Sequence, residues 1–404
     1  MSSPNGTGGP LEGFRVLDLA DEKGSACTRY FADLGADVIK VEPPGGHPTR
    51  ARPPFAHSQQ HPERSLYFLH YNANKRSITL NLDSPDGQSL FRRLAATADV
   101  VVETFAPGTM ASWGLDYPTL AAIQPRIVVT SITTFGQSGP YRDCKGGELV
   151  AFALGGMMAL TGEPGEPPCL APGDLASGMA SMHAAFATQV ALFHRLKTGR
   201  GQHVDVSVSE AAAHLGSYAV PFYSYHHEKA VRTTRTENTF ELHDVYRCKD
   251  GWVRLFILPR EHWLTFLEWL GNPEELQGPV FEDQHMRRDN SDLINPYVEE
   301  LCLRYTKQEL YQEAQARHLA VTPMNTPADF VESEQTRARE FFVELHHPVV
   351  GTYRHVGPLH KWNESAPKIR SAAPLVGQHN DEVLLDELGL SEQDLVGLRA
   401  AGAI

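Results

Sequence analysis

The N-terminal half of the chain alternates short apolar runs with longer segments of helical periodicity. The apolar runs predict strands at residues 14–19, 37–41, 77–81, 100–103, 127–132 and 203–208. The periodic segments predict helices at residues 26–34, 85–98, 117–123 and 174–198. Strands that alternate with helices are typical of a parallel sheet covered by helices. The pattern therefore predicts an α/β domain, whose ligands we expect beyond the carboxyl ends of the strands.

The pattern changes after residue 222. Residues 223–238 are polar and lack periodicity, which indicates a linker. A strand pair around 244–258 turns at Lys249-Asp250-Gly251, and helices are predicted at 262–270, 292–304 and 307–316. These elements define a smaller α+β domain at residues 239–322. Residues 323–404 begin with a return linker, Pro323 to Pro327, and end in two predicted short helices, 382–388 and 392–401.

Composition and charge narrow the classes of partner. The chain has 404 residues, 41% of them hydrophobic, enough for one large or two moderate packed domains. The formal net charge of -13 is spread along the chain, which argues against nucleic acid as a partner. A phosphate-rich ligand would therefore have to be held by local Lys and Arg side chains and by backbone amides.

The cysteine pattern and the hydropathy predict a cytoplasmic protein. The five cysteines form no CxxC pair, so the sequence suggests neither a disulfide framework nor a zinc site. The adjacent histidines at 226–227 and 346–347 lack metal-ligand spacing and are interpreted as surface residues. The N-terminal leader is not a signal peptide, and no run of about 18 apolar residues is present. We expect no metal, no export and no membrane segment.

A carboxylate stands directly before the long predicted helix, in the segment Pro172-Gly173-Asp174-Leu175-Ala176-Ser177-Gly178. On the local residues alone the favoured interpretation is a helix N-cap, because Asp is a preferred cap residue. The alternative is a nucleophile. The amides and partial positive charge of a helix start would stabilise both the carboxylate and an oxyanion formed when it attacks a carbonyl.

Three other segments carry groups that suit a ligand. They are Asn72 to Ser77, the residues Lys40, Glu42 and Arg50 around a Pro-Pro-Gly-Gly turn, and the loop Ser138 to Tyr141 with Lys145 and Glu148. A solvated turn, a surface salt bridge and a polar connection explain them almost as well. The chain has no GxSxG, Walker or GxGxxG motif, which removes the usual signals of serine hydrolases, nucleotidases and dinucleotide enzymes.

Eight blocks are spread along nearly the whole chain. They are LEGFRVLDL at residue 11, FADLGADVIKVEPPGG at 31, NANKRSITLNLDSPDG at 72, ADVVVETFAPG at 98, GQSGPY at 136, GDLASG at 173, RLKTGRGQHVDVSVSEA at 195 and VGQHNDEVLLDELGL at 376. In this order they resemble the family III coenzyme A transferases, the group that contains formyl-CoA transferase, carnitine CoA-transferase and the α-methylacyl-CoA racemases. The region from 212 to 330 matches least.

The resemblance implies a fold and an assembly. The fold is an α/β, Rossmann-like large domain made of residues 11–222 and the C-terminal part after the return linker, with a parallel sheet formed by both termini. A smaller α+β central domain completes the chain, and two subunits interlock as a homodimer. The implied activity is transfer of CoA between an acyl-CoA and a free carboxylic acid, with no cofactor beyond the CoA thioester that is its substrate.

The resemblance also implies roles for residues. Asp174 would be the nucleophile that attacks the donor thioester, giving first an aspartyl anhydride and then an aspartyl-CoA thioester. Gly173, Gly178 and Glu148 would support the oxyanion and the nucleophile. The residues implied to contact CoA are Lys40, Glu42, Arg50, Asn72, Lys75, Arg76 and Lys145.

Departures from the family pattern bear on specificity. Ala106 stands where the family often has Arg, His47 where it often has Asp, and Gly147 where the formyl-CoA branch has Tyr. In the racemase branch a His and an Asp occupy the positions of Gly147 and Glu148, so the missing imidazole favours transfer over racemisation. A catalytically silent acyl-CoA-binding protein is the third alternative. The intact Asp174 segment favours an enzyme.

Overall fold

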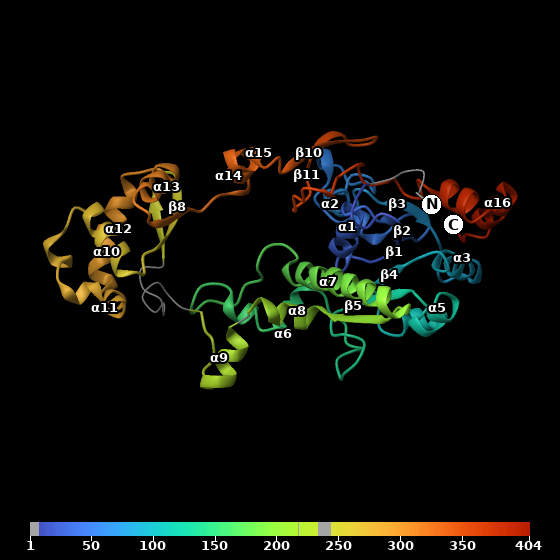
Figure 1. Cartoon of the computed structure of the whole chain (residues 1–404), viewed down its shortest axis with the longest axis horizontal. Helices are drawn as coiled ribbons and strands as arrows, with labels where there is room; N and C mark the ends of the chain where they lie inside the picture. The colour runs from blue at the N-terminus through green and yellow to red at the C-terminus, as the bar shows by residue number, and fades with distance from the viewer. Residues whose placement is uncertain (1–7, 217, 233–243) are drawn as a thin grey trace. The chain divides into compact units, whose positions relative to one another are not determined.

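The computed structural model describes residues 8–216, 218–232 and 244–404 (Figure 1). The chain divides into two compact units. The first comprises the chain up to Thr161, Cys169–Ala230 and Arg337–Ile404, and the second comprises Gly162–Pro168 and Val231–Thr336. Each unit has its own hydrophobic core.

A six-stranded parallel sheet forms the centre of the first unit, as the sequence predicts. Its strands are β1 (Arg15–Leu19), β2 (Asp37–Glu42), β3 (Arg76–Thr79), β4 (Val100–Glu103), β5 (Val128–Thr133) and β6 (His203–Ser207). The spatial order is β3-β2-β1-β4-β5-β6, and every pair is parallel. The order reverses between β1 and β4, the position at which such sheets usually bind ligands.

Helices cover both faces of this sheet (Figure 1). The main ones are α1 (Ser25–Asp33), α3 (Pro85–Ala95), α5 (Tyr117–Ile123), α6 (Glu148–Leu154), α7 (Leu175–Thr198) and α8 (Val208–Leu215). The next helix, α9 (Ala219–His226), has no buried residue and does not belong to these layers. Successive strand residues point to opposite faces, so Val100 packs with α1, α6 and α7, while Val101 packs with α3 and α5. Shorter elements in this unit are η1 (Pro48–Ala51), η2 (Ala56–Ser58), α2 (Leu66–Tyr71), α4 (Thr109–Ser112) and η3 (Met158–Leu160).

The C-terminal segment adds no strand to the six-stranded sheet, so the prediction that both termini form the sheet is wrong. It folds instead into an antiparallel hairpin, β10 (Phe342–His347) with β11 (Gly351–Val356), a π-helical turn η6 (Glu382–Glu387) and α16 (Glu392–Ala400). Side chains cover the free edge of β3: His379 Nδ1 accepts from the Ser77 amide at 3.1 Å, and Asn380 Oδ1 accepts from the Thr79 amide at 2.8 Å. These two backbone amides of the edge strand are thus hydrogen-bonded without a further strand.

The second unit holds a three-stranded antiparallel sheet with helices. The strands are β7 (Val245–Cys248), β8 (Gly251–Phe256) and β9 (Ala320–Pro323), and the predicted β7–β8 pair is confirmed. Its helices are α10 (Arg260–Trp269), η4 (Glu274–Leu276), η5 (Pro279–Glu282), α11 (Gln284–Asp289), α12 (Ser291–Leu303), α13 (Lys307–Ala316) and α14 (Pro327–Glu332). Helix α15 (Glu334–Ala338) contains the boundary between the two units. Trp263 and Phe266 lie in the core of this unit.

The predicted linkers differ from the structure in detail. Residues 223–226 belong to α9, and residues 233–238 lie outside the described part of the chain. Pro323, taken as the start of the return linker, is the last residue of β9 and lies in register with Val253 of β8. Within residues 8–216, 218–232 and 244–404, no helix has the length and hydropathy to cross a membrane, and no group of side chains has the composition of a metal site.

Candidate active site

Asp174 lies directly before α7, but the carboxylate that caps this helix belongs to Glu148. Asp174 stands at the N-cap position and its side chain makes no capping hydrogen bond. Glu148, the first residue of α6, accepts from the Ala176 amide at 2.7 Å, the Ser177 amide at 2.9 Å and the Ser177 hydroxyl at 2.7 Å. Asp174 therefore occupies the predicted N-cap position, but its side chain does not cap the helix. Glu148 leaves the Asp174 carboxylate available for other partners.

The glycines of this segment have separate uses. Gly173 has φ +83°, a conformation that side chains disfavour, so glycine suits the turn into α7. The Gly178 amide donates to the Asp174 carbonyl at 2.7 Å, the first backbone bond of the helix. The amides of Ala176, Ser177 and Gly178 are thus all engaged in this state. Their use for an oxyanion stays a prediction.

Arg52 is the cation bonded to Asp174. Its Nη2 donates to Asp174 Oδ1 at 2.9 Å, and its guanidinium lies over the Tyr67 ring at 4.2 Å from the centroid. Burial lowers the pKa of Arg52, but the hydrogen bond and charge of Asp174 outweigh burial and raise it. Arg52 therefore stays charged. The side chains of Arg52 and Asp174 are 35% and 22% exposed, so the pair is accessible.

Two tyrosines of α2 stand near the same carboxylate. Tyr67 and Tyr71 lie with ring centroids 4.7 Å apart. Burial raises the pKa of both phenols, and the negative charge of Asp174 raises it further. Both hydroxyls therefore stay protonated. Sequence reasoning missed Arg52 and both tyrosines, since 122 residues separate Arg52 from Asp174 and no spacing pattern links them.

Two of the predicted CoA contacts, Lys40 and Lys75, pair with Asp18 of β1, and a third, Asn72, is bonded to Lys75. Lys75 Nζ donates to Asp18 Oδ2 at 2.8 Å and to Asn72 Oδ1 at 3.0 Å. Lys40 Nζ donates to Asp18 Oδ1 at 3.3 Å. All four residues are buried.

The charges of this cluster depend on one another. Burial raises the pKa of the Asp18 carboxyl, but Lys40 and Lys75 outweigh burial and hold it well below its usual range. Burial lowers the pKa of Lys75 to about 8, against the opposing charge of Asp18. The two lysines and Asp18 form an internal cluster that fixes β1, β2 and the residue before β3. A role of these side chains in binding CoA stays a prediction.

Glu42 and Arg50 form a second buried pair. Arg50 donates from Nε to Glu42 Oε2 at 2.6 Å and from Nη2 to Oε1 at 2.8 Å, a bidentate geometry. Its Nη1 donates to Glu63 Oε2 at 2.6 Å, and its guanidinium lies 3.7 Å from the Phe68 ring centroid. Buried and fully engaged, the Arg50 guanidinium holds the loop after β2 in place.

The last two predicted contacts lie elsewhere. Arg76 begins β3 and pairs with Asp37, Glu382 and Glu387. Since Asp37 begins β2, this cluster lies at the amino ends of the parallel strands, away from the ends at which ligands usually bind. Lys145 is exposed in the loop before α6. The structure does not bring these two cations together with Asp174.

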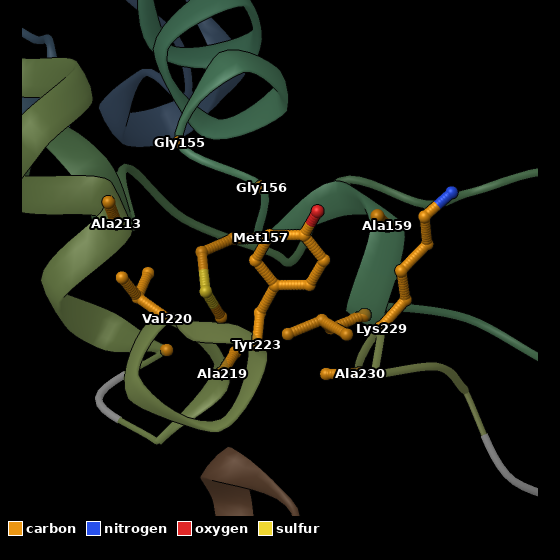
Figure 2. A pocket seen from close by; sticks show the side chains of 12 residues that line it. Gly155, Gly156, Met157, Ala159, Ala213, Ala219, Val220, Tyr223, Lys229 and Ala230 are labelled. Atoms are coloured by element: carbon orange, nitrogen blue, oxygen red, sulfur yellow. The ribbon is translucent and has the colours of Figure 1, made fainter. Parts of the chain in front are cut away.

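An apolar pocket of about 380 Å³ lies at the far end of α6 from Glu148. Its lining includes Met157, Val220, Tyr223 and Lys229, and Figure 2 shows the Tyr223 ring beside the Met157 side chain. None of the residues that contact Asp174 lines it. The arrangement at Asp174 is therefore separate: a partly exposed carboxylate, one guanidinium and two neutral phenols, suited to nucleophilic attack on a carbonyl.

Comparison with known proteins decides the family. The model of CoA-transferase family III matches residues 11–380. The chain belongs to this family. It is 33% identical, over 98% of both chains, to the succinyl-CoA–L-malate CoA-transferase beta subunit of Chloroflexus aurantiacus. It is 32% identical to the formyl-CoA:oxalate CoA-transferase of Streptomyces coelicolor, over 98% of this chain and 99% of that one.

A solved structure agrees with the assignment. A CAIB/BAIF family protein from Brucella suis superposes with a TM-score of 0.84 at 29% identity, covering 94% of this chain and 99% of the other. The resemblance inferred from the eight blocks is confirmed, and the protein is an enzyme, a family III CoA-transferase. At Gly147 of this CoA-transferase a β-carbon would meet no atom within 4 Å. A β-carbon alone therefore would not clash at this position.

Proposed function

We propose that this CoA-transferase moves coenzyme A reversibly between an acyl-CoA and a free carboxylic acid through covalent intermediates on Asp174. The observation that carries the proposal is the capping of α7 by Glu148, which accepts from the amides at 2.7 and 2.9 Å that a cap aspartate would take. Asp174 is left partly exposed beside Gly173, at the start of a helix. This is the environment that a carboxylate nucleophile needs.

The proposed chemistry has four covalent steps. Asp174 attacks the thioester carbonyl, the carbon–sulfur bond breaks, and the electron pair leaves on sulfur, giving an aspartyl anhydride and CoA thiolate. The thiolate then attacks the aspartyl carbonyl and expels the donor acid as a carboxylate. The acceptor carboxylate attacks the resulting aspartyl-CoA thioester and forms a second anhydride, from which the returning thiolate releases the new acyl-CoA and Asp174. The cycle needs no cofactor.

The substrates are proposed only as a class. The relatives from Chloroflexus aurantiacus and Streptomyces coelicolor have names that pair a CoA thioester, succinyl-CoA or formyl-CoA, with an organic acid, malate or oxalate. A CoA thioester and a free organic acid are therefore the first substrates to test. Gly147 and Glu148 offer no imidazole for the racemase alternative, and the engagement of Glu148 with α7 also disfavours it as an acid or base.

We further propose that the chain works as an interlocked homodimer in the cytoplasm. Support comes from an exposed apolar stripe on α7, spaced three to four residues apart as on one helix face. The stripe consists of Met182, Phe186, Val190, Phe193 and Leu196. A second copy of the chain would cover it, which sedimentation equilibrium tests as a mass of twice 44.7 kDa.

The test combines exchange and trapping. The enzyme is incubated with succinyl-CoA or formyl-CoA and with labelled succinate, malate or oxalate, and the transfer of label into CoA thioesters is measured. Asp174→Ala is expected to lower kcat by at least ~10⁴-fold, as removal of a covalent nucleophile does. Hydroxylamine should convert the acylated Asp174 to a hydroxamate, located by mass spectrometry.

Asp116→Ala is the matched control. Asp116 is a true N-cap, accepting from the Thr119 amide at 3.3 Å, and its loss should leave exchange unchanged. Exchange that survives Asp174→Ala contradicts the proposal. Exchange of the α proton with solvent in the absence of acceptor acid would support a racemase, and binding without turnover a silent homologue.

A further inference from the structure

Arg52 differs from the other cations discussed above because it pairs with the candidate nucleophile. It is bonded to Asp174 at 2.9 Å, whereas Lys40 and Lys75 are buried on Asp18 and Arg50 is buried on Glu42. Stacking on Tyr67 orients the guanidinium plane. Its Nη1 is shielded from solvent and has no hydrogen-bond partner within the part of the chain that the structure describes. An unsatisfied buried donor calls for an explanation, and a catalytic role is one of the known explanations.

The proposed transfer chemistry moves one negative charge without moving a proton. At rest the charge is on the Asp174 carboxylate. After the first attack Asp174 is a neutral anhydride and the charge is on the CoA sulfur. After the second step it is on the carboxylate of the departing acid, which the acceptor carboxylate then replaces, and the steps run in reverse. Each state thus holds one anion among the reacting groups.

We propose that Arg52 is a catalytic residue that pairs with this anion in each state: with Asp174 at rest, with the CoA thiolate beside each anhydride, and with the acid carboxylate beside the aspartyl-CoA thioester. The inference rests on the proposed function. Once Asp174 is acylated, its neutral ester-like oxygen no longer holds the guanidinium, and the charged partner nearby is the anion just formed. Arg52 and that anion then form the ion pair.

The chemistry of the guanidinium suits this role. A fixed cation next to the reacting atoms lowers the energy of charge that develops there, and its own reorganisation is small because the ring stacking holds it. Guanidinium binds carboxylates through parallel donors, and it is more weakly hydrated than ammonium, so it changes partners at lower cost. The amides of Ala176 and Ser177 are already bonded to Glu148, which increases the importance of Arg52 as a donor.

The test uses the full-length enzyme and the acyl-CoA and acid pair that exchanges fastest in the wild type. Arg52→Ala is expected to lower kcat about 100-fold, the effect of losing one preorganised donor, while KM changes less than about fivefold. In rapid-quench experiments without acceptor acid, the burst of released donor acid, which accompanies formation of the aspartyl-CoA thioester, should slow by a similar factor. Added guanidinium chloride, at millimolar concentrations below denaturing ones, should restore about a tenth or more of the burst rate.

Two further variants make the result specific. Arg52→Lys keeps the charge and should retain several-fold more activity than Arg52→Ala. Arg64→Ala removes an arginine from the same loop that does not contact Asp174, and should match the wild type. If Arg52→Ala folds poorly, the comparison of Arg52→Lys with Arg52→Gln replaces it, since both keep a long polar side chain.

The outcomes separate the two proposals. If Asp174→Ala abolishes exchange and hydroxylamine traps Asp174, but Arg52→Ala keeps the wild-type kcat and burst rate, Arg52 is not catalytic although the proposed function stands. A raised KM with unchanged kcat also overturns the inference, because Arg52 would then act only in ground-state binding. If the wild type neither exchanges label nor forms the hydroxamate, the proposed function itself fails.

Discussion

Asp18 and Asp174 are both aspartates paired with cations in the first unit, but their surroundings differ. Asp18 is fully buried, and each of its carboxylate oxygens faces a lysine, Lys40 at 3.3 Å and Lys75 at 2.8 Å. The Asp174 side chain is 22% exposed and one of its oxygens accepts from a single arginine at 2.9 Å. The first carboxylate has no face left for a substrate, whereas the second has.

The difference shows how a fold separates structural from reactive carboxylates. In a buried cluster, removing one partner leaves the other charges uncompensated, which strongly destabilises the folded state. The ion pairs of such a cluster therefore stay intact. A partly exposed ion pair contributes much less to stability, and breaking it during catalysis costs correspondingly little. Both sites use the same residue types, so burial and the number of partners decide their roles.

Asp18→Asn should give the largest effect on stability. The substitution keeps the shape of the side chain but leaves Lys40 and Lys75 buried with their charges unbalanced. We expect the free energy of unfolding to fall by about 3–5 kcal/mol, measured by urea titration at pH 7. Asp174→Ala is the matched comparison and should cost less than about 1 kcal/mol. Equal losses in the two variants would show that burial does not distinguish the two carboxylates.

Glu103 sharpens the comparison because it is buried and forms no ion pair with the described residues. It ends β4 next to β1, its Oε2 accepts from the Phe105 amide at 2.8 Å, and none of the ion pairs in the described residues includes it. Burial raises the pKa of Glu103 to about 7, against the opposing hydrogen bonds of Ser131 and Phe105. Within one sheet, Asp18 thus forms ion pairs with two lysines, whereas Glu103 forms none with the described residues. Their pKa values move in opposite directions.

Glu103→Gln should change the pH dependence of stability. Because the folded-state pKa of about 7 lies above the unfolded value of 4.5, the folded state keeps a proton that the unfolded state loses between these pH values. The contribution is fully present below pH 4.5 and is lost as pH rises through 7. Relative to wild type, Glu103→Gln should therefore gain about 2 kcal/mol in unfolding free energy between pH 5 and pH 8.

The control for this measurement is Glu210→Gln. Glu210 is exposed in the first turn of α8, so its substitution should leave the difference between pH 5 and pH 8 as in the wild type. Urea unfolding of the three proteins at both pH values gives the comparison. A wild-type pH dependence in Glu103→Gln would mean that this carboxyl does not retain its proton in the folded state.

The sheet could be predicted from the sequence because its strands are continuous buried apolar runs. The predicted strand at 100–103 is β4, and the predicted helix at 117–123 is α5. The β10–β11 hairpin was missed, since the burial of its residues mixes exposed, half-buried and buried positions and does not alternate regularly. Helix α2 was missed because it has six residues, too few for helical periodicity to emerge.

The site could be predicted only in part, because its contacts are long-range. Family resemblance indicated Asp174, but the capping of α7 by Glu148 joins residues 28 positions apart. Capping signals in a sequence extend only about three residues, so none pointed to Glu148. The family resemblance implied Lys40, Asn72 and Lys75 as CoA contacts, which stays a prediction. The sequence did not indicate that Lys40 and Lys75 pair with Asp18, since Asp18 lies inside an apolar strand.

Glu148→Ala should have the smallest effect, and it tests why Asp174 remains available. The substitution removes the acceptor of the Ala176 and Ser177 amides, which costs about 1 kcal/mol of unfolding free energy. Asp174 stands at the N-cap position, so its carboxylate becomes the nearest replacement acceptor. We expect kcat for CoA exchange to fall about tenfold, because about 1.4 kcal/mol of capping must be broken before attack. Glu210→Ala should leave both quantities unchanged. An unchanged kcat in Glu148→Ala would mean that Asp174 stays uncapped for a reason other than Glu148, and the Arg52 ion pair would be the contact that holds it.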